Sequence, residues 1–135
     1  MKLPMLFSND DRGEPTVVIA GGGTGGHVFP GISLAQSLEN KFPNLRIVFV
    51  GTQRGLEAEV VPRYGFELRT MTVPTLKGGS RLSRLRRVSM LPVSALQAIQ
   101  LLRGLRPSCI VSVGGYAAGP VAALGGLLGI STVLL

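Results

Sequence analysis

The sequence lacks a second cysteine, a secretory signal and an uninterrupted apolar run. Cys109 is the only cysteine, so an internal disulfide is excluded and a reducing compartment is expected. The apolar run after Met1 is too short for a signal peptide, and Asp10 and Asp11 follow it directly. Residues 107–135 carry no charge, but six glycines and Pro120 divide them. We therefore expect short buried elements there instead of a membrane span of about 20 residues.

Acidic residues are missing from the second half of the chain. Residues 1–67 carry six basic and seven acidic side chains, whereas residues 68–135 carry eight basic side chains and no acidic one. The second half thus accounts for the net charge of +7. Such an asymmetry predicts a face that meets something anionic, which could be nucleic acid, phosphate groups or anionic lipid.

Short apolar runs alternate with helical patterns. The expected strands are Thr16–Ala20, Ile47–Val50, Phe66–Met71, Ile110–Val113 and Thr132–Leu135. The expected helices are Pro30–Leu38, Leu56–Val61, Leu82–Leu91, Val93–Leu105 and one within Ala117–Leu128, with a mobile loop over Thr72–Ser80. Pro30 is expected in a first turn, and Pro62 is expected to end or kink its helix. This alternation predicts an α/β fold, a Rossmann-like doubly wound parallel sheet.

The expected boundaries give one domain over residues 16–135 after a variable N-terminal tail over residues 1–15. The last expected strand is buried, and it is cut off at Leu135. An unfinished core strand would leave unpaired backbone groups, so we expect the chain to be part of a longer protein.

A glycine loop, GGGTGGH, occupies residues 21–27 between the first strand and its helix. Glycines leave backbone N–H groups uncovered near the positive end of a helix, which suits phosphate, pyrophosphate or a developing alkoxide. The spacing also matches a dinucleotide fingerprint, but a nicotinamide-binding domain needs an acid near the end of the second strand. Thr52 stands there, and Glu57 is the first acid beyond it. We therefore disfavour a nicotinamide-binding domain.

His27, the only histidine, ends this loop. Ligands of open α/β sheets bind at the carboxyl ends of the strands, and an imidazole there could take a proton from a sugar hydroxyl. The alternative is a purely structural histidine. A second loop, GGYAAGP over residues 114–120, follows the strand Ile110–Val113, and we expect both loops to face one crevice.

Together these motifs resemble the N-terminal domain of the MurG family of N-acetylglucosaminyltransferases. The resemblance runs from about Thr16 to Leu135 and rests on GGTGGHVFPG at residues 22–31, Gly51-Thr52, Glu57, Val61-Pro62 and residues 114–120. It implies an inverting glycosyltransferase of the GT-B fold, with two doubly wound halves and no metal or other cofactor in the active site. The N-terminal half takes the lipid acceptor. A C-terminal half, missing from this chain, holds most of the UDP-sugar donor, so this chain alone is expected to be inactive.

The resemblance also implies substrates and site residues. The donor is UDP-N-acetylglucosamine, and the acceptor is undecaprenyl-pyrophosphoryl-muramoyl-pentapeptide at the cytoplasmic face of the bacterial cell membrane. His27 maps onto the family's loop histidine, a candidate catalytic base, and Thr24, Gly25 and Gly26 map onto its donor contact. We expect the acceptor and its pyrophosphate to meet Gly22, Gly23, Gly114, Gly115 and Tyr116. The alternative is a stand-alone membrane-associated binding subunit of a split glycosyltransferase.

A basic and apolar stretch precedes the second glycine loop. Leu82, Leu85, Val88 and Leu91 recur every three residues and could line one side of a helix. We expect peripheral binding to an anionic membrane through Leu82, Arg84, Leu85, Arg86, Arg87 and Val88. The alternative is a surface helix packed on its own core. Nucleic acid is disfavoured, because the chain has no tryptophan, few tyrosines and no helix-turn-helix or zinc pattern.

Overall fold

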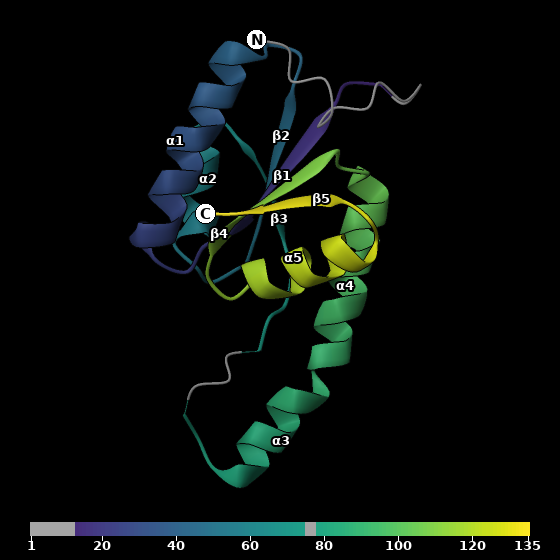
Figure 1. Ribbon diagram of the computed structural model, residues 1–135. Coiled ribbons are helices and arrows are strands. Elements are labelled where there is room, and N and C mark those ends of the chain that lie inside the picture. Colours follow the sequence, from purple (N-terminus) through teal and green to yellow (C-terminus); the bar gives the residue numbers. More distant parts are fainter. Residues whose placement is uncertain (1–12, 75–77) are drawn as a thin grey trace.

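In the computed structural model, which describes residues 13–74 and 78–135, five strands form one parallel sheet (Figure 1). The strands are β1 (Thr16–Gly21), β2 (Arg46–Gly51), β3 (Glu67–Thr70), β4 (Cys109–Gly114) and β5 (Ser131–Leu134). The helices are α1 (Gly25–Lys41), α2 (Glu57–Arg63), α3 (Arg81–Ser89), α4 (Leu91–Leu105) and α5 (Ala118–Leu127). The predicted alternation of strands and helices is confirmed.

Helices cover both faces of the sheet. On one face, Val28 and Ile32 of α1 pack in the same cluster as Ile19 of β1. On the other face, Leu102 of α4 packs with Val18 of β1. Side chains along a strand point alternately to opposite faces, so a strand covered on both sides is apolar throughout. This double cover explains why β1 reads as an unbroken apolar run.

The strand order is β3-β2-β1-β4-β5, with every neighbouring pair parallel. The chain moves outward from β1 through β2 to β3, then returns to place β4 on the other side of β1. This reversal between β1 and β4 is the switch point at which doubly wound sheets bind ligands. The predicted Rossmann-like fold is confirmed, and the two glycine loops follow the two central strands.

Helix α1 begins at Gly25, five residues before the predicted start at Pro30. Thr24 precedes the helix with an extended backbone, and its carbonyl accepts from the N–H groups of His27 and Val28 at 3.1 and 3.0 Å. The last part of the glycine loop is therefore the first turn of the helix. The prediction of Pro30 in a first turn is wrong, because Pro30 lies inside α1.

Other boundaries differ less. Pro62 lies within the last turn of α2, and β3 is shorter than predicted. The final strand was expected to be buried, but β5 is an edge strand with mostly exposed residues, because no described element covers its outer side. Residues 1–12 of the predicted tail and 75–77 of the predicted loop lie outside the described residues.

Helix α3 extends beyond the sheet at the end of α4 (Figure 1). Within the described residues, Arg81–Leu105 is the one helical stretch that could cross a membrane by length and composition. Its two helices meet at Met90, and Ala98 and Leu102 pack α4 onto the sheet. Residues 107–135 form short elements, β4, α5 and β5, as predicted.

Candidate functional site

The two glycine loops touch each other at the switch point. The Gly22 N–H donates to the Gly114 carbonyl oxygen at 3.1 Å, and a Cβ atom on Gly115 would overlap the backbone of Gly22. The regular pairing of β1 with β4 shifts register where β1 ends, between Ala20 and Gly21. The two loops therefore lie together at the end of the sheet where β1 and β4 finish, and a crevice that both loops face remains a prediction.

The start of α1 presents the first loop's open N–H groups. Gly25 and Gly26 are the first two helical residues, and N–H groups in a first turn have no acceptor within the helix. These groups lie at the positive end of a 17-residue helix, which favours a negatively charged ligand. The Thr24 side chain makes no hydrogen bond to the helix backbone. It turns to His27 instead.

His27 lies between the two loops. Its Nδ1 is 3.2 Å from Thr24 Oγ1, and either group can be the donor, depending on the imidazole tautomer. On its other side, a Cβ atom on Gly114 would lie 2.9 Å from His27 Cδ2 and 3.0 Å from Nε2. When Nδ1–H donates to Thr24, Nε2 keeps the lone pair that a base requires.

Tyr116 brings an aromatic ring from the second loop to the first. The side chain is exposed, and a Cβ atom on Gly23 would lie 3.9 Å from Tyr116 Cδ2. The structure therefore gathers Gly22, Gly23, His27, Gly114 and Tyr116 in one place. Their predicted roles toward donor and acceptor remain predictions.

Glu57 is a residue of this site whose role the sequence did not predict. It is 1% exposed, and its carboxylate accepts from the Gly23 N–H at 2.6 Å, from the Thr52 N–H at 2.7 Å and from Thr52 Oγ1 at 2.9 Å. Burial opposes its ionisation, but these hydrogen bonds outweigh burial and hold the pKa of the Glu57 carboxyl below its usual 4.5. With these oxygens occupied by the protein, Glu57 does not supply the ribose-binding acid of a nicotinamide site.

The hydrogen bond to Glu57 also bears on how the first loop can meet a ligand. The N–H groups of Gly22 and Gly23 donate to the Gly114 carbonyl and to Glu57, while the predicted contact of these two residues with the acceptor pyrophosphate remains a prediction. Both groups already have an acceptor inside the protein. The open donors of this loop therefore lie beyond Gly23, at the start of α1, where Gly25 and Gly26 are the first helical residues.

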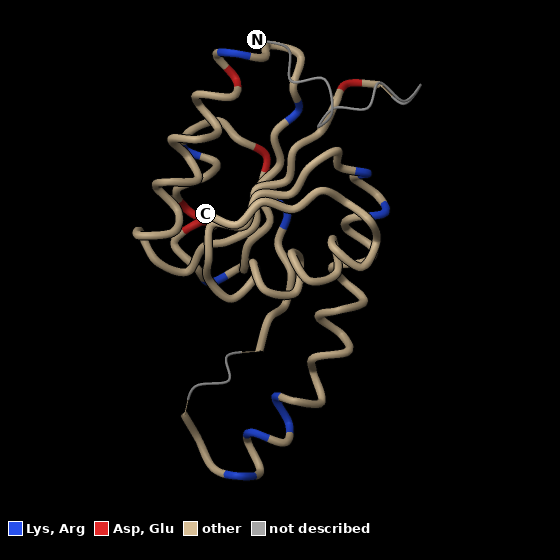
Figure 2. The backbone as a smooth tube through the Cα atoms, in the orientation of Figure 1, with Lys and Arg blue, Asp and Glu red and all other residues tan. Residues whose placement is uncertain are grey.

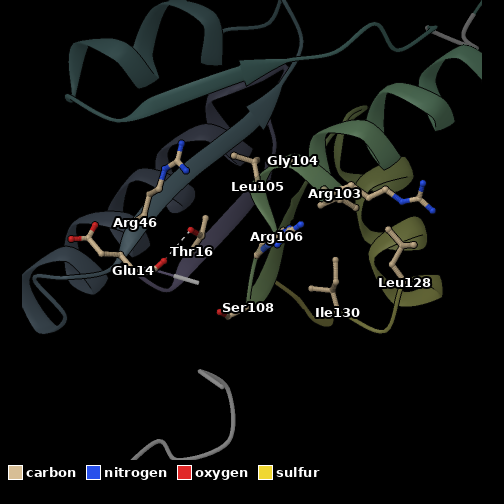
Figure 3. A pocket seen from close by; sticks show the side chains of 13 residues that line it. Glu14, Thr16, Arg46, Arg103, Gly104, Leu105, Arg106, Ser108, Leu128 and Ile130 are labelled. Carbon is tan, nitrogen blue, oxygen red and sulfur yellow. Dashed lines mark hydrogen bonds between the residues drawn. The ribbon is translucent and has the colours of Figure 1, made fainter. Parts of the chain in front are cut away.

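A cavity of about 710 Å³ lies at the opposite end of the sheet, where the strands begin (Figure 3). Thr16 at the start of β1, Arg46 at the start of β2 and Ser108 just before β4 line it. Because the glycine loops follow the other ends of these strands, this cavity shares no residue with the two loops. It is therefore separate from the candidate site.

Helix α3 exposes both basic and apolar side chains. Leu82 is 78% exposed and Leu85 is 68% exposed, and no residue of the helix is buried. Ser80 caps the helix by accepting from the Ser83 N–H. Figure 2 shows basic residues along α3 and no acidic residue on it. The alternative of a helix packed on its own core therefore does not fit the described residues.

Comparison with known proteins gives a consistent result. The chain matches the glycosyltransferase family 28 N-terminal domain over residues 17–134. It is 50% identical over 118 residues to the UDP-N-acetylglucosamine–N-acetylmuramyl-(pentapeptide) pyrophosphoryl-undecaprenol N-acetylglucosamine transferase of Anaeromyxobacter sp. (strain Fw109-5). The identity to the transferase of the same name from Myxococcus xanthus is 45% over 118 residues. Each match covers 87% of this chain and 31% of the relative.

The solved structures include a similar fold. The crystal structure of Acinetobacter baumannii MurG matches with a TM-score of 0.75 and 23% sequence identity, over 89% of this chain and 34% of that one. At this identity the match shows the fold alone. The chain spans about a third of the length of each of these proteins.

Proposed function

We propose, from the premise that this chain belongs to glycosyltransferase family 28, that it is the acceptor-binding and membrane-facing domain of an N-acetylglucosaminyltransferase. The donor would be UDP-N-acetylglucosamine, and the acceptor a muramoyl-pentapeptide carried on a polyprenyl pyrophosphate, as the names of the relatives state. The product would be a precursor for peptidoglycan synthesis. The active enzyme needs a donor-binding domain in addition to this chain.

The observation that supports this proposal best is the contact between the two glycine loops. It brings His27, the open N–H groups of Gly25 and Gly26, and Tyr116 to one edge of the sheet. A sugar transferase needs such a combination. Deprotonating the attacking hydroxyl calls for a base, and the departing diphosphate calls for N–H donors at a helix start.

The transfer step follows from this arrangement. The acceptor hydroxyl gives its proton to His27 Nε2 while its oxygen attacks the anomeric carbon of N-acetylglucosamine. The new carbon–oxygen bond replaces the bond to UDP, which leaves with the electron pair, so the configuration at that carbon inverts. The N–H groups of Gly25 and Gly26 face the negative charge that develops on the diphosphate.

Helix α3 would hold the domain on the cytoplasmic membrane surface, where the lipid acceptor lies. Its exposed leucines can enter the acyl boundary while Arg84 and Arg86 meet lipid phosphates. The excess of basic residues after Glu67 also suits the acceptor pyrophosphate.

The test supplies the part that this chain does not contain. This chain is joined to the portion of the Anaeromyxobacter relative that follows its matched region, with the complete relative as the positive control. We expect radiolabelled N-acetylglucosamine to pass from UDP-N-acetylglucosamine to a polyprenyl-pyrophosphoryl-muramoyl-pentapeptide. A folded fusion that transfers no label, beside an active control, would refute the proposal.

Two further experiments distinguish a split enzyme from a single chain and locate the donor site. Restored transfer on mixing the two parts unjoined would support a split enzyme with a separate binding subunit. The chain alone should bind UDP-N-acetylglucosamine only weakly, because most donor contacts are expected outside it. Micromolar affinity in calorimetry would place the donor site in this domain.

A further inference from the structure

Glu57 is the one buried acid among the described residues, and all its partners lie in two turns that follow neighbouring strands. One carboxylate oxygen accepts from Gly23 after β1, and the other accepts twice from Thr52 after β2. Thr52 Oγ1 in turn accepts from the Gly55 N–H at 3.1 Å. Glu57 forms no ion pair with any of the described residues. Its negative charge is therefore stabilised by hydrogen bonds alone, most of them from the backbone.

The glycines around Glu57 make room for the carboxylate. A Cβ atom on Gly22, Gly51 or Gly55 would overlap the Glu57 side chain. Gly51 and Gly55 do not have a positive φ, so their backbone conformation is open to other residues. The carboxyl group is what excludes a side chain at these two positions. This fit indicates a built receptacle for a carboxylate, because an uncharged residue of smaller size would not need three glycines around it.

We propose that Glu57 is a positioning residue that holds the first glycine loop in the shape in which only the N–H groups at the start of α1 face a phosphate. This inference rests on the proposed function, because the phosphate in question belongs to the UDP-sugar. Glu57 takes the Gly23 N–H, and the Gly114 carbonyl takes the Gly22 N–H. A diphosphate therefore meets Gly25 and Gly26. Glu57 itself touches no substrate and acts through Gly23.

Charge strengthens this selection. A carboxylate beside Gly22 and Gly23 repels a diphosphate from that part of the loop. The repulsion is stronger than in water because a buried site has a lower effective dielectric constant. The helix start attracts the same ligand. A glutamine has the shape of glutamate, but its NH₂ group is a donor and cannot accept from Gly23 or Thr52. Glu57→Gln therefore sets a donor NH₂ group against the N–H of Gly23 or of Thr52 while keeping the side-chain volume.

The first test needs no enzymatic activity and begins with the wild-type chain. In the ¹⁵N-labelled chain, the amide protons of Gly23 and Thr52 donate to a carboxylate, so we expect them to resonate downfield. Both should move upfield together in acid, with a midpoint below 4.5, as the carboxyl takes up a proton. A repeat with His27→Ala removes the other ionisable side chain of the loop. Absence of this joint shift, in the wild type or in His27→Ala, would overturn the proposal.

The second test uses Glu57→Gln, with Glu59→Gln as the matched control. Glu59 lies on the same helix but is exposed and pairs with Arg63 at 2.6 Å, so its replacement removes the same charge without touching the loop. Glu57→Gln should displace the Gly23 and Gly25 amide resonances and leave those of Val48 in β2 unchanged. Glu59→Gln should displace none of them. Equal spectra for the two variants would contradict the proposal.

The third test is kinetic and uses the fused transferase. Misplacing a binding group by about 1 Å can cost about 100-fold, so Glu57→Gln should lower kcat/KM for UDP-N-acetylglucosamine by about 10- to 100-fold. It should leave the KM for the lipid acceptor within about twofold. Glu59→Gln should match the wild type. A loss shared equally by the two variants, or one confined to the acceptor KM, would overturn the proposal.

The proposal about Glu57 can still be tested if the fused enzyme is inactive or if Glu57→Gln does not fold. If the wild-type fusion transfers no sugar, the proposed function fails, while the amide titration still decides whether Glu57 holds the loop. If Glu57→Gln does not fold, Thr52→Val removes one donor to the carboxylate and leaves the Gly23 bond. Thr52→Val should then displace the Gly23 resonance less than acid does, and no displacement at all would count against coupling of the two turns.

Discussion

The His27 ring lies against the Cα of Gly114, so close that a Cβ atom there would be 2.9 Å from its Cδ2. Gly114 also has a φ of +91°, a conformation that side chains rarely adopt. Gly114→Ala should therefore lower the free energy of unfolding by about 1–3 kcal/mol and push the imidazole from its place. Chemical denaturation and the His27 ring NMR signals measure the two effects.

Gly119→Ala is the control for that change. Gly119 lies in the first turn of α5 with no atom within 4 Å of an added Cβ, and its φ is not positive. Alanine should raise the free energy of unfolding there by about 0.4–1 kcal/mol. Equal losses at the two positions would show that neither the positive φ nor the His27 contact sets the cost of a side chain at Gly114.

The stability of the domain should respond to acid through Glu57. Because its folded pKa lies below 4.5, the unfolded chain binds the proton more tightly, and the stabilisation is present above pH 4.5 and lost as pH falls through the lowered value. At pH 7 the wild type should exceed Glu57→Gln by about 1.5–3 kcal/mol, and this gap should shrink in acid. Urea unfolding at several pH values measures it.

Comparing the free energy of unfolding of the wild type with that of Glu57→Gln separates the effect of Glu57 from the effects of the other acidic residues. The pKa of Glu67 is also lowered, chiefly by its hydrogen bond from Arg46, but that pair is present in both proteins and cancels. A gap that persists unchanged in acid would show that folding does not lower the pKa of the Glu57 carboxyl.

His27 is predicted to be the base of the transfer reaction. In the fused enzyme, His27→Ala should lower kcat by roughly 10²–10⁴-fold, and the acidic limb of the pH–rate profile should flatten. His27→Asn keeps a hydrogen-bonding group near Thr24 and should not restore the rate. A loss below about tenfold with the acidic limb intact would assign His27 to loop structure instead.

Helix α3 is predicted to bind anionic bilayers. Near such a surface each basic side chain contributes about 1 kcal/mol, so replacing Arg84 and Arg86 by serine should weaken binding to phosphatidylglycerol vesicles about 30-fold. Replacing Lys41 and Arg103, which lie outside α3, removes the same charge and should change little. Vesicle flotation at low and high salt tests both, since screening should weaken the wild-type interaction. Equal binding to neutral vesicles would contradict the electrostatic part.

Cys109 should resist thiol reagents in the folded protein. It is buried in β4, and burial raises the pKa of its thiol, so the reactive thiolate is scarce and shielded. Modification by a disulfide reagent should be slower than in denaturant by at least about tenfold. Ser89→Cys in a Cys109→Ser background places a thiol on exposed α3 and should react rapidly. Fast labelling of native Cys109 would show that β4 opens readily.

Local pattern predicted the fold well and the site in part. Runs such as β1 are apolar because both their faces are covered, so the strands could be found from the sequence. The start of α1 was missed, because glycine disfavours helices and the Thr24 carbonyl that accepts the first helical bonds leaves no trace in the sequence. The role of Glu57 depends on a backbone donor 34 residues away in the chain, and only the folded sheet brings the two together.

The contact between the loops constrains how this domain can be inherited. Gly22 and Gly114 are joined by a backbone hydrogen bond at the ends of adjacent strands, although they are 92 positions apart in the sequence. A recombination junction anywhere between them would join a first loop from one ancestor to a second loop from another. Such hybrids would keep every strand and helix, but their two loops could fit each other poorly where they touch. Functional exchanges between related transferases should therefore carry both loops on a single segment.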